Sequence, residues 1–324
     1  MEKRYTTWND YLRQKYGGKV CKLPIDAGFD CPNRDGTVAY GGCTFCTVSG
    51  SGDMILEPEA PIDVQMTAEI EKYHLKWPSA TKYFAYFQNF TNTHGPVQLL
   101  RERFEPALSF KPKNGEIVGI AIGTRPDCLP EETIGYLAEI QARGFEVWLD
   151  LGLQTTFQET SDKINRAHDY ATYVDAVERL RARNLNACVH LINGLPGETH
   201  DMMLENVRRI VADTDIQGIK LHLLHLMRKT AMVRDYHAGD VRLLGMDEYV
   251  QLVCDQLEMI PGNIVIHRLT GDAPRDLLIG PMWSLKKWEV LNAVDDEMAR
   301  RGSVQGLKTT QPYVLANRVE LTHV

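Results

Sequence analysis

Residues 116–155 read EIVGIAIGTRPDCLPEETIGYLAEIQARGFEVWLDLGLQT and contain two strand-like runs with a helical pattern between them. The runs cover 116–122 and 145–153 and are rich in β-branched and other apolar residues, while the helical pattern covers 131–143. Gly144 stands where a helix has to end before the second run begins. A strand, a helix and a second strand in this order predict a βαβ crossover between two parallel strands.

The same alternation continues along much of the chain. Strand-like runs lie at 19–25, 81–87, 116–122, 145–153, 186–192 and 216–224, and helical patterns lie at about 61–76, 96–108, 131–143, 170–183 and 199–212. Six strands in unbroken alternation with helices predict an α/β fold. We expect a partial (βα)6 barrel of the TIM type, in preference to an open doubly wound sheet.

This pattern predicts three parts. Residues 1–19 form a basic and aromatic N-terminal segment, and residues 20–225 form the barrel. Beyond residue 225 the alternation weakens, but no linker-like composition separates the rest of the chain. Residues 226–324 are therefore expected to form a C-terminal α/β extension that packs on the barrel.

The composition is that of an ordinary globular protein. The chain has 324 residues, of which 44% are hydrophobic, and a formal net charge of −7. No apolar run approaches the roughly 18 residues of a membrane span, and the N-terminus is too polar for a secretory signal. Seven cysteines, an odd number, do not look like a disulfide framework. We expect a cytoplasmic protein without a membrane partner.

The connections that follow the predicted strands are polar and rich in turn residues. They lie at 26–36, 88–95, 123–130, 154–160, 193–199 and 225–230. The connections from helix to strand are short and carry little chemistry. In βα barrels the reactive groups sit where strands end and the following loops begin. The sequence therefore predicts one active site on one face of the barrel.

Three cysteines gather in the loop after the first strand, in CPNRDGTVAYGGCTFC, residues 31–46. Cys43 and Cys46 form a CxxC pair, which zinc sites, redox dithiols and iron–sulfur sites share. A redox dithiol leaves Cys31 unexplained, and a zinc-binding structural or interaction protein needs Cys21 as a fourth ligand. Cys21 lies inside the first strand-like run, where a packing role is expected. The remaining alternative is a cluster held by three thiolates, with one coordination position open.

The C-x11-C-x2-C spacing, with Phe45 before the last cysteine, resembles the radical S-adenosylmethionine (SAM) superfamily. The first interval is longer than the common C-x3-C-x2-C. It resembles the branch that contains the catalytic subunit of elongator and the bacterial YtqA/YhcC-type proteins. The likeness continues through TRPD, DLGLQT, LPGET, HRLTGDAP and PMWSLKKW, so it covers nearly the whole chain.

This resemblance implies two cofactors, a four-iron, four-sulfur (4Fe–4S) cluster and SAM. Cys31, Cys43 and Cys46 are the implied cluster ligands, and the open iron holds the amino and carboxylate groups of SAM. The further cofactor contacts that it implies are Phe45, Gln88, Asn89, Arg125, Asp150, Gln154, Gly194 and Gly197. Gln88 and Asn89 stand where members of the superfamily carry a Gly-Gly-Glu-like segment that contacts the SAM amino group.

The chemistry of several of these residue types suits contacts with SAM. Asp150 and Gln154 can both face the barrel interior because side chains alternate along a strand. The guanidinium of Arg125 suits a carboxylate. A salt bridge for Arg125 and barrel packing for Gln154 remain as alternatives. Gly194 and Gly197 allow close backbone approach to adenine, and a left-handed turn before a helix cap explains that segment too.

Four histidines on strand-like segments and three further cysteines are assigned no metal. They are His190, His222, His225, His267, Cys128, Cys188 and Cys254. Such histidines are expected to be hydrogen-bonded core or polar lining, and the cysteines are expected to be buried structural residues.

The resemblance also implies an activity. A reduced cluster passes one electron to SAM, and the resulting 5′-deoxyadenosyl radical removes a hydrogen atom from the substrate. The branch points to tRNA, and to conversion of a carboxymethylaminomethyl group on C5 of the wobble uridine to aminomethyl. A reductant such as flavodoxin or ferredoxin is the implied electron donor. A radical SAM enzyme that acts on a small metabolite or a protein is the alternative, beside the zinc-binding protein.

RNA binding needs local basic surface, because the chain is acidic overall. The candidates are Lys3, Arg4, Arg13, Lys15 and Lys19 at the N-terminus, together with Lys286, Lys287, Arg300 and Arg301. The N-terminal set is interleaved with Tyr5, Trp8, Tyr11 and Tyr16, a composition that suits backbone contacts and base stacking. An amphipathic helix that packs its aromatic side chains on the barrel explains the same residues.

Overall fold

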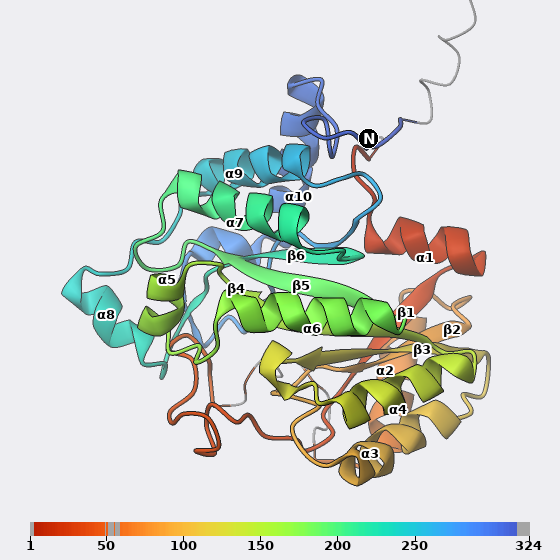
Figure 1. Cartoon of the computed structure of the whole chain (residues 1–324). Coiled ribbons are helices and arrows are strands. Elements are labelled where there is room, and N and C mark those ends of the chain that lie inside the picture. Colours follow the sequence, from red (N-terminus) through yellow and green to blue (C-terminus); the bar gives the residue numbers. More distant parts are fainter. Residues whose placement is uncertain (1–2, 49, 51–54, 56–58, 316–324) are drawn as a thin grey trace, which may run out of the picture.

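The computed structural model describes residues 3–48, 50, 55 and 59–315. Parallel strands form one curled sheet in the order β1-β2-β3-β4-β5-β6-β8 (Figure 1). Their bounds are β1 (Val20–Ile25), β2 (Lys82–Phe87), β3 (Glu116–Thr124), β4 (Glu146–Gln154), β5 (Asn186–Asn193), β6 (Gly218–Leu223) and β8 (Val265–Arg268). This seven-stranded half-barrel confirms the predicted partial barrel of the TIM type.

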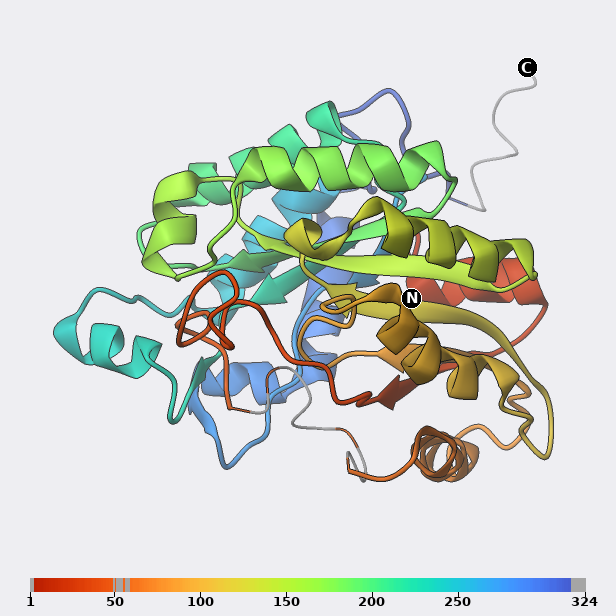
Figure 2. The ribbon, with the colours of Figure 1, turned by 60° about the horizontal axis from the view of Figure 1, so that its bottom comes forward.

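Helices cover the outer face of the sheet (Figures 1 and 2). The crossover helices are α2 (Ile62–His74), α3 (Val97–Ser109), α4 (Glu131–Ala142), α6 (Tyr170–Ala182), α7 (His200–Asp213) and α9 (Met246–Met259). The remaining elements are α1 (Trp8–Tyr16), η1 (Pro126–Cys128), α5 (Gln158–Lys163), β7 (Leu226–Met227), α8 (Met232–Ala238), β9 (Leu278–Gly280), η2 (Met282–Leu285) and α10 (Lys287–Arg300). None of the described helices combines the length and the apolar character that crossing a bilayer requires.

The seventh strand comes from the part of the chain that the sequence assigned to the extension. β8 pairs in parallel with β6, with Gly218 opposite Val265, and so lengthens the sheet beyond the six expected strands. β1 and β8 are the two edges of the sheet, so the barrel is open between them. The N-terminal segment covers part of the β8 edge through a bridge from Thr7 to Ile266. The boundary at residue 225 stays a prediction.

Strand alternation decides which side chains of β1 enter the barrel. Cys21, Leu23 and Ile25 belong to the main core between the sheet and the helices. Lys22 and Pro24, between them, face the barrel interior and line its cavity. A lysine inside the barrel is unusual, because burial disfavours an unpaired charge.

Helix α1 closes the end of the barrel where the strands begin, opposite the cysteine loop (Figure 1). The ring of Trp8 lies 5.6 Å from that of Phe84, 5.1 Å from that of Trp148 and 4.1 Å from that of His267. Tyr11 also packs on Trp148, at 5.8 Å. These edge-to-face and tilted contacts form the aromatic floor of the barrel. The aromatic side chains of α1 therefore pack on the barrel, which was the alternative to contact with RNA.

Two of the N-terminal lysines are already paired. Lys3 forms an ion pair with Asp295, and Lys15 lies 3.1 Å from a carboxylate oxygen of Glu146. Glu146 also accepts hydrogen bonds from the hydroxyl groups of Tyr11 and Tyr16. These contacts hold α1 against the sheet. They also neutralise part of the positive charge that was predicted to bind RNA.

A glycine substitution can test the packing of the barrel floor. A Cβ atom on Gly119 would lie 2.4 Å from the ring of Phe84 and 2.5 Å from the carbonyl oxygen of Glu146. We therefore expect Gly119→Ala to lower the free energy of unfolding by about 1–3 kcal/mol, as overpacking does. Gly135 in α4 has no atom within 4 Å of such a Cβ, so Gly135→Ala should raise it by about 0.5–1 kcal/mol. Urea unfolding of both variants measures the difference, and equal midpoints would contradict the close approach at Gly119.

Candidate active site

A cavity of about 510 Å³ lies at the carboxyl ends of the strands. The loops after β1, β2, β3, β4 and β6 contribute to its wall, whereas the loop after β5, at 193–199, which the sequence also included, does not. Cys31, Cys43 and Cys46 line this cavity together. The structure therefore brings three thiols from one loop to one site.

The cysteine loop is held by the segment 164–168, which follows α5 (Figure 2). The side-chain amide of Asn165 donates hydrogen bonds to the carbonyl oxygens of Tyr40, at 3.0 Å, and Gly42, at 2.8 Å. The backbone N–H of Thr44 donates to the carbonyl oxygen of Ile164 at 3.0 Å. The loop is thus fixed against the end of β4 although it has little regular structure of its own.

Two side-chain donors point at one cysteine sulfur. Asn33 Nδ2 and Arg166 Nη1 each lie 3.6 Å from Cys43 Sγ. Burial, followed by the neighbouring Cys43, raises the pKa of the Cys46 thiol to about 12, against the opposing charge of Arg34. A free Cys46 is therefore protonated at neutral pH, and metal binding has to displace that proton. Donors to a ligand sulfur stabilise the thiolate form and tune an attached cluster.

Cys21 does not belong to this set. It is 1% exposed in the core outside the barrel and does not line the cavity. The position of Cys21 opposes a four-cysteine zinc site and leaves three thiols in the cavity.

The predicted cofactor contacts divide into two groups. Those that line the cavity are Phe45, Gln88, Arg125, Asp150 and Gln154, and those that do not are Asn89, Gly194 and Gly197. Asn89 instead donates to the carboxylate of Asp26 and ties together the loops after β1 and β2. Gly194 and Gly197 have φ values of 88° and 85° in the turn before α7, which agrees with the left-handed-turn alternative. The cofactor roles of all eight residues stay predictions.

Arg125 uses its guanidinium within the protein. Its Nε and Nη2 atoms donate to Asp127 at 2.9 and 2.8 Å, and Nη1 donates to the carbonyl oxygen of Arg166 at 2.9 Å. Nη2 also lies 3.1 Å from the carbonyl oxygen of Ala167. Arg125 therefore fixes the segment that holds the cysteine loop. Its ion pair with Asp127 is the salt bridge that the sequence left open as the alternative to a SAM contact.

Arg166 is one of the residues of this site that sequence reasoning missed, together with Lys22 and Lys220. Its Nε atom donates to the carbonyl oxygen of Gly152 at 3.0 Å, and its Nη1 atom points to Cys43. It is 6% exposed and lines the cavity. The only signal in the sequence is its place in the connection after the fourth strand, because no motif surrounds it.

A layer of charge lies deeper in the barrel, around Asp150. Lys220 donates to the Asp150 carboxylate and, at 3.1 Å, to the hydroxyl of Tyr86. The ammonium of Lys22 lies 4.0 Å from the same carboxylate. Burial alone would raise the pKa of Asp150, but Lys220 and Lys22 hold it well below its usual value. Asp150 is therefore a carboxylate throughout the neutral range.

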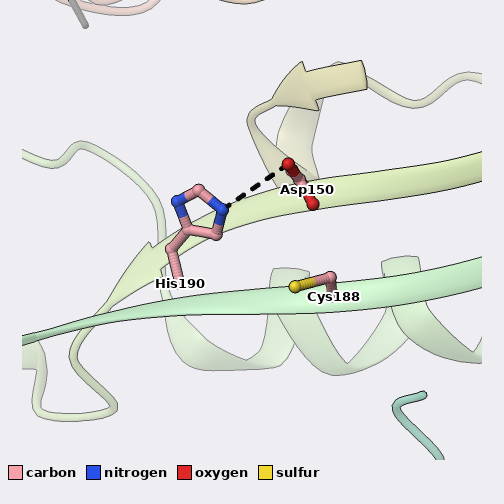
Figure 3. Close-up of side chains that lie close together, drawn as sticks. All are labelled: Asp150, Cys188 and His190. Atoms are coloured by element: carbon pink, nitrogen blue, oxygen red, sulfur yellow. Dashed lines mark ion pairs between the residues drawn. The ribbon is translucent and has the colours of Figure 1, made fainter. Parts of the chain in front are cut away.

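Figure 3 shows Asp150, Cys188 and His190 side by side, with the imidazole of His190 3.9 Å from the Asp150 carboxylate. Their possible ligand atoms lie within 4.8 Å of one another, as in a metal site. Burial keeps His190 neutral by lowering its pKa and keeps Cys188 protonated by raising its pKa. A cation here would compete with two buried ammonium groups for one carboxylate. We assign these residues to the polar lining, in line with the role expected for the histidines.

The positive charge of this layer exceeds the negative charge that faces it. Lys22 lies between the rings of Trp8, at 4.7 Å, and Tyr86, at 4.6 Å. Its nearest carboxylate, Asp150, is already bonded to Lys220. One carboxylate thus serves two lysines in the wall of the cavity, Lys220, which is buried, and Lys22, whose side chain is 18% exposed. Such a surplus suits an anionic group of a ligand.

Comparison with known proteins identifies the class. Residues 33–210 match the family profile described as the Radical SAM superfamily, and residues 216–300 match the Radical_SAM C-terminal domain. The uncharacterized protein YtqA of Bacillus subtilis (strain 168) is 53% identical over 305 residues, which cover 94% of this chain and 92% of YtqA. The chain therefore belongs to the radical SAM superfamily and is a radical SAM enzyme. Its cofactors are the 4Fe–4S cluster and SAM that members of this family bind.

Two further likenesses are more distant. A tRNA uridine(34) acetyltransferase of Methanocaldococcus jannaschii is 22% identical over 164 residues, which cover 50% of this chain and 30% of that protein. The solved structure of the archaeal Methanocaldococcus infernus Elp3 with an N-terminal deletion is 16% identical. It superposes with a TM-score of 0.66 and covers 88% of this chain and 64% of that one. At this identity the likeness to Elp3 is one of fold.

We propose Cys31, Cys43 and Cys46 as the cluster ligands, because they are the thiols that share the cavity with two donors to Cys43. After anaerobic reconstitution, alanine at any of the three should abolish the brown chromophore and SAM cleavage. Cys21→Ala is the matched control and should keep both, since its side chain lies on the other side of β1. Iron analysis and the visible spectrum measure the effect. Equal loss of iron in the Cys21 variant would overturn the three-ligand assignment.

Proposed function

We propose that this protein is a radical SAM enzyme that acts on tRNA and converts a carboxymethylaminomethyl group on C5 of the wobble uridine to aminomethyl. The observation that carries the proposal is the surplus of buried positive charge in the cavity that holds the three cysteines. A carboxymethylaminomethyl group ends in a carboxylate, which is the chemistry that this surplus suits. The partial match to a tRNA uridine(34) acetyltransferase supports the same nucleoside.

The charged layer and the three cysteines line the same cavity, so one ligand group can reach from one to the other. The charged layer of Lys22, Asp150 and Lys220 and the cysteine loop line one space of about 510 Å³. A carboxylate held at the charged layer would place the rest of the group toward the cysteines. Pockets of this size bury most of a small ligand and orient it through a few polar groups.

The residues of this chain would bind and orient the substrate and keep water out. When bound, the cluster and SAM would supply a radical that takes one hydrogen atom from the methylene between the nitrogen and the carboxylate, and would accept the second electron of the oxidation. Water would then cleave the bond between that carbon and the nitrogen, which releases the two-carbon group as glyoxylate and leaves the aminomethyl group. The protein has to present the methylene next to the carboxylate to that radical and to exclude competing hydrogen donors. Pairing the carboxylate with Lys22 fixes one end of the group, which is the positioning that selects one methylene. A reductant such as a flavodoxin or ferredoxin is the proposed electron source.

The direct test uses tRNA that carries the carboxymethylaminomethyl group. The reconstituted enzyme, SAM and a chemical reductant are incubated with it under anaerobic conditions, and the nucleosides are analysed by mass spectrometry. We expect the carboxymethylaminomethyl nucleoside to disappear and the aminomethyl nucleoside to appear, with the Cys43→Ala protein as the inactive control. If SAM is cleaved but the tRNA is unchanged, a small metabolite or a protein becomes the better substrate.

The charge of Lys22 gives the reaction a pH dependence. Burial lowers its pKa to about 8; Asp150 and Cys188 oppose this shift, and Lys220 and Arg268 add to it. Lys22 is therefore an ammonium below pH 8 and becomes neutral as the pH rises through that value. KM for the modified tRNA should be constant below pH 8. It should rise above pH 8, because neutral Lys22 no longer forms an ion pair with the carboxylate of the carboxymethylaminomethyl group.

Replacement of Lys22 isolates this contact. Lys22→Met keeps the length of the side chain, so packing between the rings is largely preserved. Losing one charge-assisted hydrogen bond should raise KM roughly ten- to hundredfold at pH 7, and the variant should lose the rise above pH 8. Lys163→Met is the control, because Lys163 pairs with Glu159 on the surface of α5. An unchanged KM for Lys22→Met would show that the charge of Lys22 does not contribute to substrate binding.

A further inference from the structure

Three segments far apart in the sequence meet at one place on the protein. Lys19 precedes β1, Lys76 and Trp77 follow α2, and Trp288 lies in the first turn of α10. The ammonium groups of Lys19 and Lys76 lie 4.6 and 4.7 Å from the centre of the Trp77 ring, and Lys76 is 5.8 Å from that of Trp288. We call these four residues the tryptophan–lysine surface.

The two lysines of this surface lack an acidic partner among the described residues. Lys19 donates to the side-chain oxygen of Asn9 at 2.9 Å, and neither Lys19 nor Lys76 is within ion-pair distance of a described carboxylate. Burial and the positive charges of Arg13 and Lys76 lower the pKa of Lys19. Like charges gathered on one ring repel each other, and an anion relieves that repulsion.

The other basic candidates differ from these lysines. Lys286 lies 2.9 Å from Glu289, and Lys287 lies 2.8 Å from Asp272. Arg300 and Arg301 both pair with Glu297, at 2.7 Å. These pairs neutralise much of the positive charge that was predicted to bind RNA. Of the predicted residues, Arg4, Arg13 and Lys19 have no carboxylate partner among the described residues. Lys76, which was not among the predicted residues, has none either.

Trp288 supplies a second feature of the surface. Its side chain is 68% exposed, which is unusual for the largest apolar side chain of a globular protein. An indole ring in water next to an unpaired ammonium is a platform on which a nucleobase can stack while its phosphate meets the lysine. A surface for an acidic peptide would need the lysines but not the exposed ring.

The surface continues into the cavity. Tyr73 of α2 lines the cavity, and its ring stacks on that of Trp77 with centres 5.8 Å apart. Asp272 also lines the cavity and pairs with Lys287, the residue before Trp288. Tyr73 and Trp77 thus connect the cavity wall to Lys76, whose ammonium lies near both the Trp77 ring and the exposed indole of Trp288.

We propose that the tryptophan–lysine surface docks a single-stranded RNA segment, with phosphates on Lys19 and Lys76 and a base stacked on Trp288, so that the neighbouring nucleotide enters the cavity from the open side of the barrel. This inference rests on the proposed function, since it takes the substrate to be a tRNA. It adds the place and the direction of entry, which the family likeness does not supply.

The test measures binding of the reconstituted protein to a labelled anticodon stem-loop by fluorescence anisotropy between low and high salt. Each phosphate contact to a single strand contributes a slope of about −0.7 against the logarithm of the salt concentration. The double variant Lys19→Gln/Lys76→Gln should therefore flatten the slope by about 1.4, for two contacts. Trp288→Ala should weaken binding about tenfold at every salt concentration, as the loss of one stacked base does.

Controls separate this surface from general charge and from the chemistry. Lys111→Gln/Lys113→Gln removes two exposed lysines from the connection before β3, and its slope should equal that of the parent. SAM cleavage without RNA should be unchanged in all variants. Binding of a polyglutamate peptide as tight as that of RNA would overturn the assignment to RNA.

The remaining outcomes distinguish this inference from the proposed function. If the parent modifies tRNA and both surface variants bind the stem-loop within twofold of it, the docking surface is wrong and the proposed function stands. If the variants lose binding but the wobble nucleoside is never altered, the surface stands and the proposed reaction fails. If the parent binds no RNA even at low salt, both fail together.

Discussion

The guanidinium of Arg166 is the contact on which the active site depends. It joins the carbonyl oxygen of Gly152, in a central strand, to the sulfur of Cys43, in a loop with little regular structure. Arg125 holds the backbone of Arg166 from the next loop along the sheet. A rigid sheet thereby fixes the position of a loop whose glycines would otherwise leave it many conformations. The cluster site is built by tertiary contacts more than by the loop itself.

A second constraint is the imbalance of charge inside the barrel. Burying two lysines around one aspartate costs free energy, because Lys22 is supported only by aromatic rings and a carboxylate 4.0 Å away. A fold gains nothing in stability from such an arrangement over an apolar layer. Its place in the wall of the cavity makes ligand binding the simplest physical reason for it. The same argument excludes a metal ion at Asp150, since a second cation would add to the surplus.

The open side of the half-barrel links the two proposals. β1 and β8 are edges that a closed barrel would not have, and the N-terminal segment covers only part of the β8 edge. We propose this side as the route by which a group carried by a large molecule reaches the cavity. A nucleotide attached to a folded RNA needs such an entrance, whereas a free metabolite can use a narrow one. The proposed tryptophan–lysine surface would hold the RNA on this side of the barrel.

Local sequence patterns were sufficient to predict the architecture and to identify the three candidate thiol ligands. Strand and helix periodicities are short-range, so the alternation along 116–155 predicted the parallel sheet, and the loop polarity predicted the reactive face. The spacing of Cys31, Cys43 and Cys46 lies within one loop and could be read directly. The seventh strand was missed as part of the sheet, because pairing of β8 with β6 is a contact between distant segments.

The sequence by itself determined the element order, the face that carries the site and the three candidate ligands, because each depends on neighbours along the chain. Only the tertiary structure decided the partners of the charged residues. Arg125 and Asp150 line the cavity, but their ion pairs, the contacts of Arg166 and the surplus charge at Lys22 depend on which strands lie side by side. Electrostatic energy falls with distance in space and not with separation in sequence, so no local pattern could reveal them.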